Sequence, residues 1–119
     1  MTKEALLYQF WNSFGIPGYE ENTVPEDATF PYITYQVITD SLNSDVQQAV
    51  SVWYRGTSWI DVNRKTDEIS RAIGTGGIIL DGKIWIKRGT SFAHNMGDAD
   101  DDLIKRKYLN LSVEYFTED

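Results

Sequence analysis

The chain has 119 residues, a length typical of one domain that buries about two-thirds of its unfolded surface. It has no cysteine, which excludes disulfides, thiolate metal sites and cysteine nucleophiles. Its 18 acidic and 11 basic side chains give a net charge of −7, which opposes binding to a phosphate backbone, and no stretch has the length and apolarity of a membrane span. We therefore expect one domain over residues 1–119, with no specific nucleic-acid binding and no membrane.

The N-terminal residues 2–14 predict a helix. Five apolar side chains fall on one helical face, and Gly15 and Pro17 follow as stop signals. Residues 16–31 have neither helical nor strand periodicity. This second segment therefore predicts a long irregular connection.

The two segments after this connection predict a hairpin. Residues 32–39 are rich in β-branched and aromatic side chains, and residues 46–55 place Val50, Val52 and Tyr54 on one face. Residues 40–45 are rich in turn-forming side chains. We therefore expect two antiparallel strands joined by a short link.

Residues 58–73 predict the helix around which the rest of the domain is organised. Ser58 can cap its first turn, and Gly74 can adopt the left-handed conformation that ends it. Because its apolar side chains form one stripe, this helix should pack across one face of an antiparallel sheet. The stripe consists of Trp59, Val62, Ile69 and Ile73, with Thr66 in the gap.

A second hairpin is predicted where Asp81 and Gly82 separate the apolar runs 78–80 and 83–88. This pattern favours a type I′ turn, which has positive φ at both central residues. Residues 89–102 have no regular period, and we expect an exposed loop there that contains His94, the only histidine.

Residues 104–116 show the clearest alternation of apolar and polar side chains and predict a long last strand. The order of elements is then α, β, β, α, β, β, β. This order predicts an α+β fold, with a mostly antiparallel sheet of about five strands and two helices packed on one side of it.

The aspartates near the end of the predicted loop are the main candidates for a charged site. They lack the spacing, the glycine and the terminal glutamate of a helix-loop-helix calcium loop, so we expect a solvated or partner-facing acidic loop. No nucleophile elbow or paired-carboxylate signature is present, and we expect no catalytic residue, no cofactor and no enzyme activity. The four aspartates are Asp98, Asp100, Asp101 and Asp102.

Six basic residues lie on or beside the last two predicted strands, and neighbouring strands could gather them into one band. With Trp85 and Tyr108 such a band could bind nucleic acid, contact an acidic patch of a neighbouring subunit, or protect a strand edge. The net charge favours the subunit contact over nucleic acid. The six residues are Lys83, Lys87, Arg88, Lys105, Arg106 and Lys107.

Four strings, in this order, make the chain resemble a phage protein family. The strings are FPYITYQVITD, SVWYRGTSWIDVNRKTDEISRAIG, IWIKRGTSFAHNMGDADDD and IKRKYLNLSVEYF. With them the chain resembles the tail terminator or tail completion proteins of phages and prophages of Gram-positive bacteria, a group often labelled minor capsid protein. The resemblance implies a structural virion protein that forms a homohexameric ring at the head-proximal end of a long non-contractile tail.

The resemblance also implies partners and a location. The ring would contact the major tail tube protein and a neck or head completion protein, in the virion and, during assembly, in the host cytoplasm. We expect the acidic loop of Asp98, Asp100, Asp101 and Asp102 to face the lumen and repel DNA. We expect subunit contacts at Trp85, Phe92, Met96, Lys105 and Lys107.

Three other functions stay open at the level of the sequence. The first is a head-side neck connector, which also forms rings, or a minor capsid protein. A monomeric prophage-encoded protein-interaction module would use the aromatic side chains for one partner and form no ring. An enzyme with a divalent metal at the acidic loop would melt at a higher temperature when calcium or magnesium is added.

Overall fold

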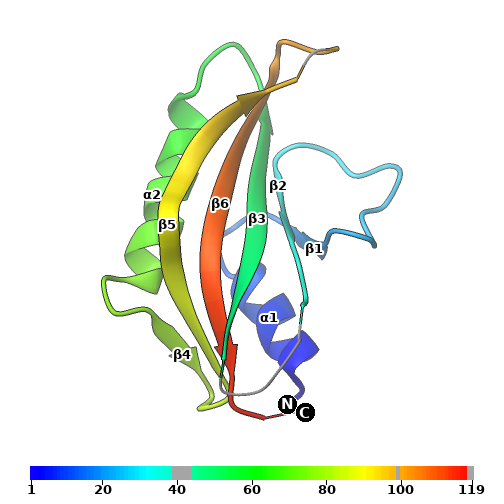
Figure 1. Cartoon of the computed structure of the whole chain (residues 1–119). Coiled ribbons are helices and arrows are strands. Elements are labelled where there is room, and N and C mark those ends of the chain that lie inside the picture. Colours follow the sequence, from blue (N-terminus) through cyan, green and yellow to red (C-terminus); the bar gives the residue numbers. More distant parts are fainter. Residues whose placement is uncertain (39–43, 99, 118–119) are drawn as a thin grey trace.

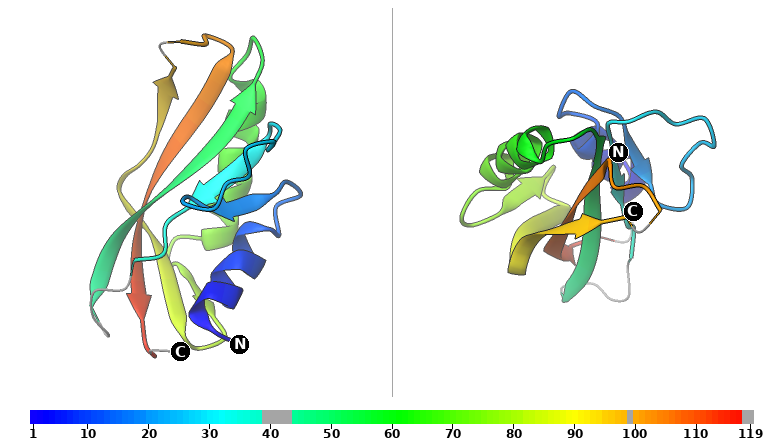
Figure 2. Two further views of the ribbon diagram at one scale, coloured as in Figure 1. Left: turned by 90° about the vertical axis from the view of Figure 1, so that its right-hand side faces the viewer. Right: turned by 90° about the horizontal axis from the view of Figure 1, so that it is seen from above.

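The computed structural model describes residues 1–38, 44–98 and 100–117, and Figure 1 shows the whole chain. The strands form a single sheet in the order β1-β2-β3-β6-β5-β4, and both helices cover the same face of this sheet (Figures 1 and 2). The elements are α1 (Lys3–Trp11), β1 (Gly18–Glu20), β2 (Tyr32–Tyr35), β3 (Asp45–Arg55), α2 (Ile60–Ile73), β4 (Ile78–Leu80), β5 (Ile84–Gly97) and β6 (Ile104–Tyr115).

The predicted α+β class is confirmed, but the sheet has six strands instead of about five and is mixed. The extra strand, β1, lies inside the segment predicted as an irregular connection and pairs with β2 in parallel. Three residues are too few to show a strand period, which is why the sequence pattern did not indicate it. Strand β2 ends at Tyr35, earlier than predicted, and most of the predicted link 40–45 lies outside the described residues.

The prediction of an exposed loop over residues 89–102 is wrong for most of its length. Strand β5 continues to Gly97 and pairs with β6, with a shift of register between Arg88 and Ala93. Such an irregularity breaks the alternation of side chains between the two faces, so the sequence loses the period of two although the strand continues. His94 is therefore a strand residue, and only a short acidic loop separates β5 from β6.

The Asp-Gly hairpin between β4 and β5 has the predicted backbone conformation. Asp81 has φ 52° and Gly82 has φ 67°, as a type I′ turn requires. The N–H of Lys83 donates to the carbonyl of Leu80 over 2.9 Å. The second strand begins one residue later than predicted, at Ile84.

The core lies between the helix-facing side of the sheet and the two helices. The stripe of α2 is buried as predicted at Val62, Ile69 and Ile73. Thr66 is buried in the same stripe, and its hydroxyl donates a hydrogen bond to the Val62 carbonyl over 2.8 Å. Helix α2 begins at Ile60, and its N-cap residue is Trp59, which makes no side-chain capping bond, instead of the predicted Ser58. The Ser58 hydroxyl accepts the Ile60 N–H over 3.1 Å just before the helix. Helix α1 ends at Trp11, three residues before the predicted end.

Gly77 should tolerate no side chain, because its backbone and its surroundings both exclude one. Its φ is +86°, and a Cβ placed there lies 2.6 Å from the Ile86 carbonyl oxygen. We expect Gly77→Ala to lower the free energy of unfolding by about 1–3 kcal/mol, and the melting temperature by several degrees. Gly76→Ala is the control, since a Cβ at Gly76 meets nothing within 4 Å. Equal melting temperatures for the two variants would show that the strand pairing adapts to the added methyl.

Candidate assembly surface on the open face of the sheet

One face of the sheet carries no helix (Figure 2), and the aromatic side chains on it are mostly half-buried among one another. Successive residues of a strand point to opposite faces, so every second residue of β2, β3, β5 and β6 lies on this open face. The other residues of the same strands form the core beneath the helices. The open face is therefore a surface that the topology leaves without a covering helix.

A continuous row of aromatic rings and one guanidinium crosses this open face. Tyr32 stacks on Trp53 with ring centroids 6.1 Å apart and an interplanar angle of 24°. The Arg106 guanidinium carbon lies 4.5 Å from the Trp53 ring and 5.5 Å from that of Tyr108. We call this set the aromatic row: Tyr19, Tyr32, Trp53, Arg106, Tyr108 and His94.

The strand register creates the row. Trp53 of β3 lies opposite both Tyr32 of β2 and Arg106 of β6, and His94 of β5 lies opposite Tyr108 of β6. Cross-strand neighbours on one face are close enough for aromatic and long side chains to touch. The row therefore depends on pairings between segments far apart in the sequence.

Two hydrogen bonds hold the largest side chains of the row in place. The Trp53 indole N–H donates to the Thr34 hydroxyl over 2.9 Å, and Arg106 Nε donates to the Ser51 hydroxyl over 2.9 Å. Because these polar atoms are already paired within the sheet, a partner that packs on the rings does not have to satisfy them. Fixed side chains also lose less conformational entropy on binding.

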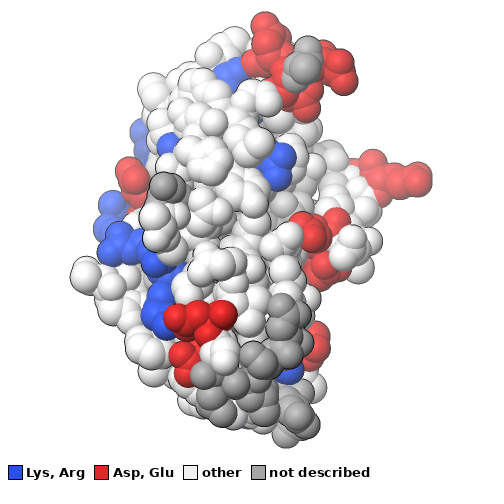
Figure 3. Space-filling view, in the orientation of Figure 1, with Lys and Arg blue, Asp and Glu red and all other residues white. Residues whose placement is uncertain are grey.

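Charged groups surround the row more than they interrupt it. Figure 3 shows that much of the open face carries no charge, while acidic residues gather at its upper end and along its right-hand edge. Arg106 is the formal charge within the row itself. An aromatic centre with a charged rim is the composition of a protein interface.

The six basic residues do not form the single band that the sequence suggested. Arg88 reaches α2 on the helix side and donates to the Ser70 hydroxyl over 3.0 Å, whereas Arg106 lies in the row on the open face. Lys87 pairs with Asp45 over 2.8 Å. Consecutive strand residues point to opposite faces, so a run of basic residues along a strand is divided between the two sides.

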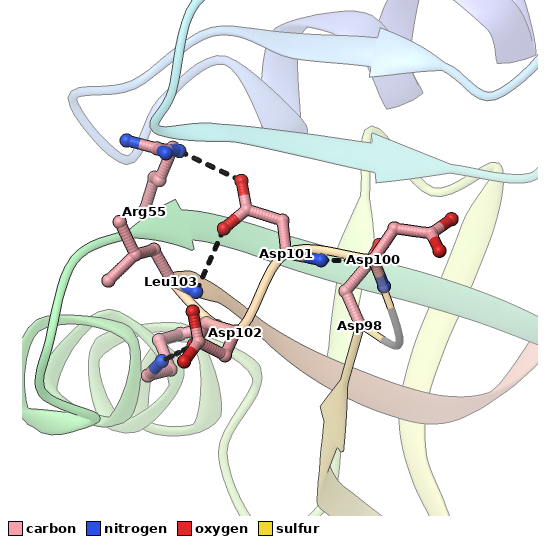
Figure 4. A network of polar contacts seen from close by, with 7 residues as sticks. Arg55, Asp98, Asp100, Asp101, Asp102 and Leu103 are labelled. Carbon is pink, nitrogen blue, oxygen red and sulfur yellow. Dashed lines mark hydrogen bonds and ion pairs between the residues drawn. The ribbon is translucent and has the colours of Figure 1, made fainter.

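The acidic loop between β5 and β6 is ordered by its own hydrogen bonds (Figure 4). An Asp98 carboxylate oxygen accepts the N–H groups of Asp100 and Asp101 over 2.8 and 3.1 Å. The Asp101 carboxylate accepts the Leu103 N–H over 3.0 Å and pairs with Arg55 over 3.1 Å. The bond from Leu103 and the Arg55 charge hold the pKa of Asp101 below its usual value.

The carboxylates of this loop do not converge. In Figure 4 the Asp101 side chain points to Arg55, while those of Asp100 and Asp102 point in other directions. Within the part of the chain that the structure describes, no three or more His, Asp or Glu side chains are grouped to hold a metal ion. Asp98 and Asp101 therefore stabilise the conformation of the loop through their hydrogen bonds. The side chains of Asp100 and Asp102 are exposed.

Among the predicted contact residues, Met96 lies beside the aromatic row. It is opposite Arg106 in the strand register and 36% exposed. Phe92 is half-buried against the core, with the Arg88 guanidinium carbon 6.0 Å from its ring. Trp85 lies at the other end of β5, with the Lys87 ammonium 4.1 Å from its ring.

The two predicted contact lysines on β6 are both engaged within the subunit. Lys105 is only 8% exposed, and its ammonium donates to the Asp102 carbonyl. Lys107 donates to Asn63 of α2 over 3.0 Å and to Asn95 over 2.8 Å. Lys105 thus connects the acidic loop to β6, and Lys107 connects α2 to β6.

Sequence reasoning missed most of the aromatic row. The alternation of residues 104–116 already placed Tyr108 on the face opposite the apolar one. Tyr19 lies in a strand too short to be recognised, and the pairing of Trp53 with Tyr32 and Arg106 needs the register. The sequence pattern that could have indicated the row is the presence of aromatic residues at alternating positions on the polar faces of several strands.

Comparison of the chain with models of known protein families and with curated proteins gives no match. Among the described residues, no helix is long and apolar enough to cross a membrane. The open face of the sheet and the resemblance of the four sequence strings are therefore the features of this chain that bear on its function.

Proposed function

We propose that the protein is a structural subunit of a phage tail, of the tail terminator type, and that it forms a homohexameric ring at the head-proximal end of the tail tube. The aromatic row on the open face of the sheet is the observation that carries this proposal. A subunit of a ring needs a contact surface that stays exposed until a neighbour covers it, and aromatic and arginine side chains contribute most of the binding energy at such surfaces.

The type of ring is proposed from the resemblance of four sequence strings to tail terminator proteins. In this role the ring contacts the major tail tube protein on one side and a neck or head completion protein on the other. It belongs to the virion and assembles in the host cytoplasm. The central channel of such a ring passes DNA, so its wall should repel phosphate.

A tube-growth assay tests this function. The purified protein is added to growing tubes of the major tail tube protein of the same phage, and tube lengths are measured by negative-stain electron microscopy. We expect shorter tubes, each with a ring at one end. Tubes of unchanged length and without a ring would contradict the terminator function and favour a head-side neck connector.

The acidic loop provides a second prediction. We place it at the lumen, where the charges of Asp100 and Asp102 repel DNA. Changing both to asparagine removes these charges but keeps the hydrogen bonds of Asp98 and Asp101, so the ring should still assemble. We expect DNA passage to slow several-fold, measured as the rate of DNA ejection and the plating efficiency of phage that carry the variant.

The control for this loop variant removes two other exposed charges. Glu26→Gln together with Asp27→Asn changes two exposed acids on the connection between β1 and β2. Phage with this control should plate like the wild type. Equal ejection rates for the loop variant and the wild type would argue against the lumen position.

A further inference from the structure

The outer side of α1 is a second uncovered surface, opposite the open face of the sheet. Helix α1 packs on the covered face, so its outer side points away from the sheet (Figure 2). Tyr8 on this side is 59% exposed, and a shallow hollow of about 620 Å³ lies beside it. We call the residues that line this hollow the α1 patch: Met1, Ala5, Tyr8, Gln9, Asn12 and Ser13.

The border of the α1 patch and the aromatic row carry opposite charges. The α1 patch contains no charged side chain, and the exposed acid Glu4 lies at its border, one helical turn before Tyr8. Arg106 is the formal charge within the aromatic row. An apolar surface bordered by an acid therefore fits an aromatic surface that contains a guanidinium.

One edge of the sheet is blocked, which limits how subunits can join. The Asn12 side chain accepts the Gly18 N–H over 2.9 Å and donates to the Gly18 carbonyl over 3.0 Å, on the free side of β1. The Glu20 carbonyl accepts the Thr23 N–H over 2.9 Å. A sheet that continues through a ring needs a free edge on both sides of every subunit, so the blocked β1 edge excludes this way of joining and favours a contact that does not extend the sheet.

We propose that the α1 patch of one subunit packs on the aromatic row of the next copy of this chain. The inference rests on the proposed function, since it specifies which two surfaces of the ring subunit meet. The sheet then has helices on both faces, its own two on one side and α1 of the neighbour on the other. Because the two surfaces differ and lie on opposite sides of the molecule, the contact is head-to-tail and can close into a ring.

A mixing experiment tests this pairing. Tyr8→Glu disrupts the α1 patch, Trp53→Glu disrupts the aromatic row, and each variant of the full chain keeps the other surface intact. Each variant alone should be monomeric by light scattering. In an equal mixture, the intact row of the first variant should bind the intact patch of the second, giving a one-to-one dimer and nothing larger.

Two further variants keep the test decisive. Ile60→Glu introduces the same charge at another exposed apolar residue, 62% exposed on α2, and should retain the wild-type mass. His94→Glu, at the exposed end of the row, replaces Trp53→Glu if circular dichroism shows that the latter does not fold.

The possible outcomes separate the pairing from the ring itself. A wild-type oligomer that survives Tyr8→Glu, or two variants that stay monomeric when mixed, overturns the pairing of these surfaces and leaves the ring proposal intact. A wild-type protein that is monomeric at every concentration overturns both. A one-to-one dimer that forms in the mixture but in neither variant by itself supports the head-to-tail contact.

Discussion

The Trp53→Ala variant is expected to lose self-assembly while it keeps its fold. Trp53 lies in the middle of the aromatic row, between Tyr32 and the Arg106 guanidinium. An aromatic side chain at the centre of an interface typically contributes about 2–4 kcal/mol to binding. Its removal should therefore weaken self-association by about 30-fold to about 700-fold, at 1.4 kcal/mol for each factor of ten. Sedimentation velocity over a series of concentrations measures this shift.

The neighbouring residue on the same strand supplies the control. Tyr54 points to the other face of β3 and packs against the core, where burial raises the pKa of its hydroxyl. Tyr54→Ala should lower the stability of the fold but leave assembly of the folded protein unchanged. If Trp53→Ala assembles like the wild type, the aromatic row is not a contact surface between subunits.

The Trp11→Ala variant is expected to lower the free energy of unfolding by about 3–5 kcal/mol, because it leaves a large cavity in the core. Trp11 is 2% exposed, and its ring lies 4.8 Å from that of Phe10 and 6.3 Å from that of Tyr35. The side chain thus joins α1 to β2. Urea unfolding followed by circular dichroism should show a much lower midpoint.

Tyr8→Ala is the matched control for Trp11, on the exposed side of the same helix. It should change the free energy of unfolding only slightly, since Tyr8 is mostly exposed. Both variants are measured at concentrations at which the wild type is monomeric, because self-association would itself add apparent stability. Similar unfolding midpoints for Trp11→Ala and the wild type would contradict the central role of Trp11 in the core.

The parts of the fold that the sequence predicted correctly are those with a strong local pattern. The stripe of α2, the alternation of β6 and the positive φ values at Asp81 and Gly82 all depend on residues close together in the chain. In each case the periodicity or the turn chemistry determines the local structure. The two helices on one face of the sheet followed from these elements.

The parts that the sequence did not predict depend on distant pairing. Strand β1 has only three residues and is held by its parallel pairing with β2. The second half of β5 follows a shift of register, so its side chains lose the alternation that marks a strand. Local pattern cannot indicate either feature, because the stabilising partner is elsewhere in the chain.

The candidate site was harder to predict than the fold for the same reason. The sequence predicted sites at two runs of charged residues, namely the acidic loop and the basic residues of the last two strands. The pleat of the sheet divides the basic residues between two faces. The strand register, by contrast, assembles the aromatic row from five strands: β1, β2, β3, β5 and β6. Met96, predicted as a contact residue, lies beside this row.

The solution mass of the purified wild-type protein is the most direct test of ring assembly. It should be measured by light scattering over a wide range of concentrations, with negative-stain imaging of any large species. We expect a species of hexamer mass, seen as ring-shaped particles, that dissociates on dilution. A protein that stays monomeric at every concentration and shows no rings would contradict self-assembly through the aromatic row.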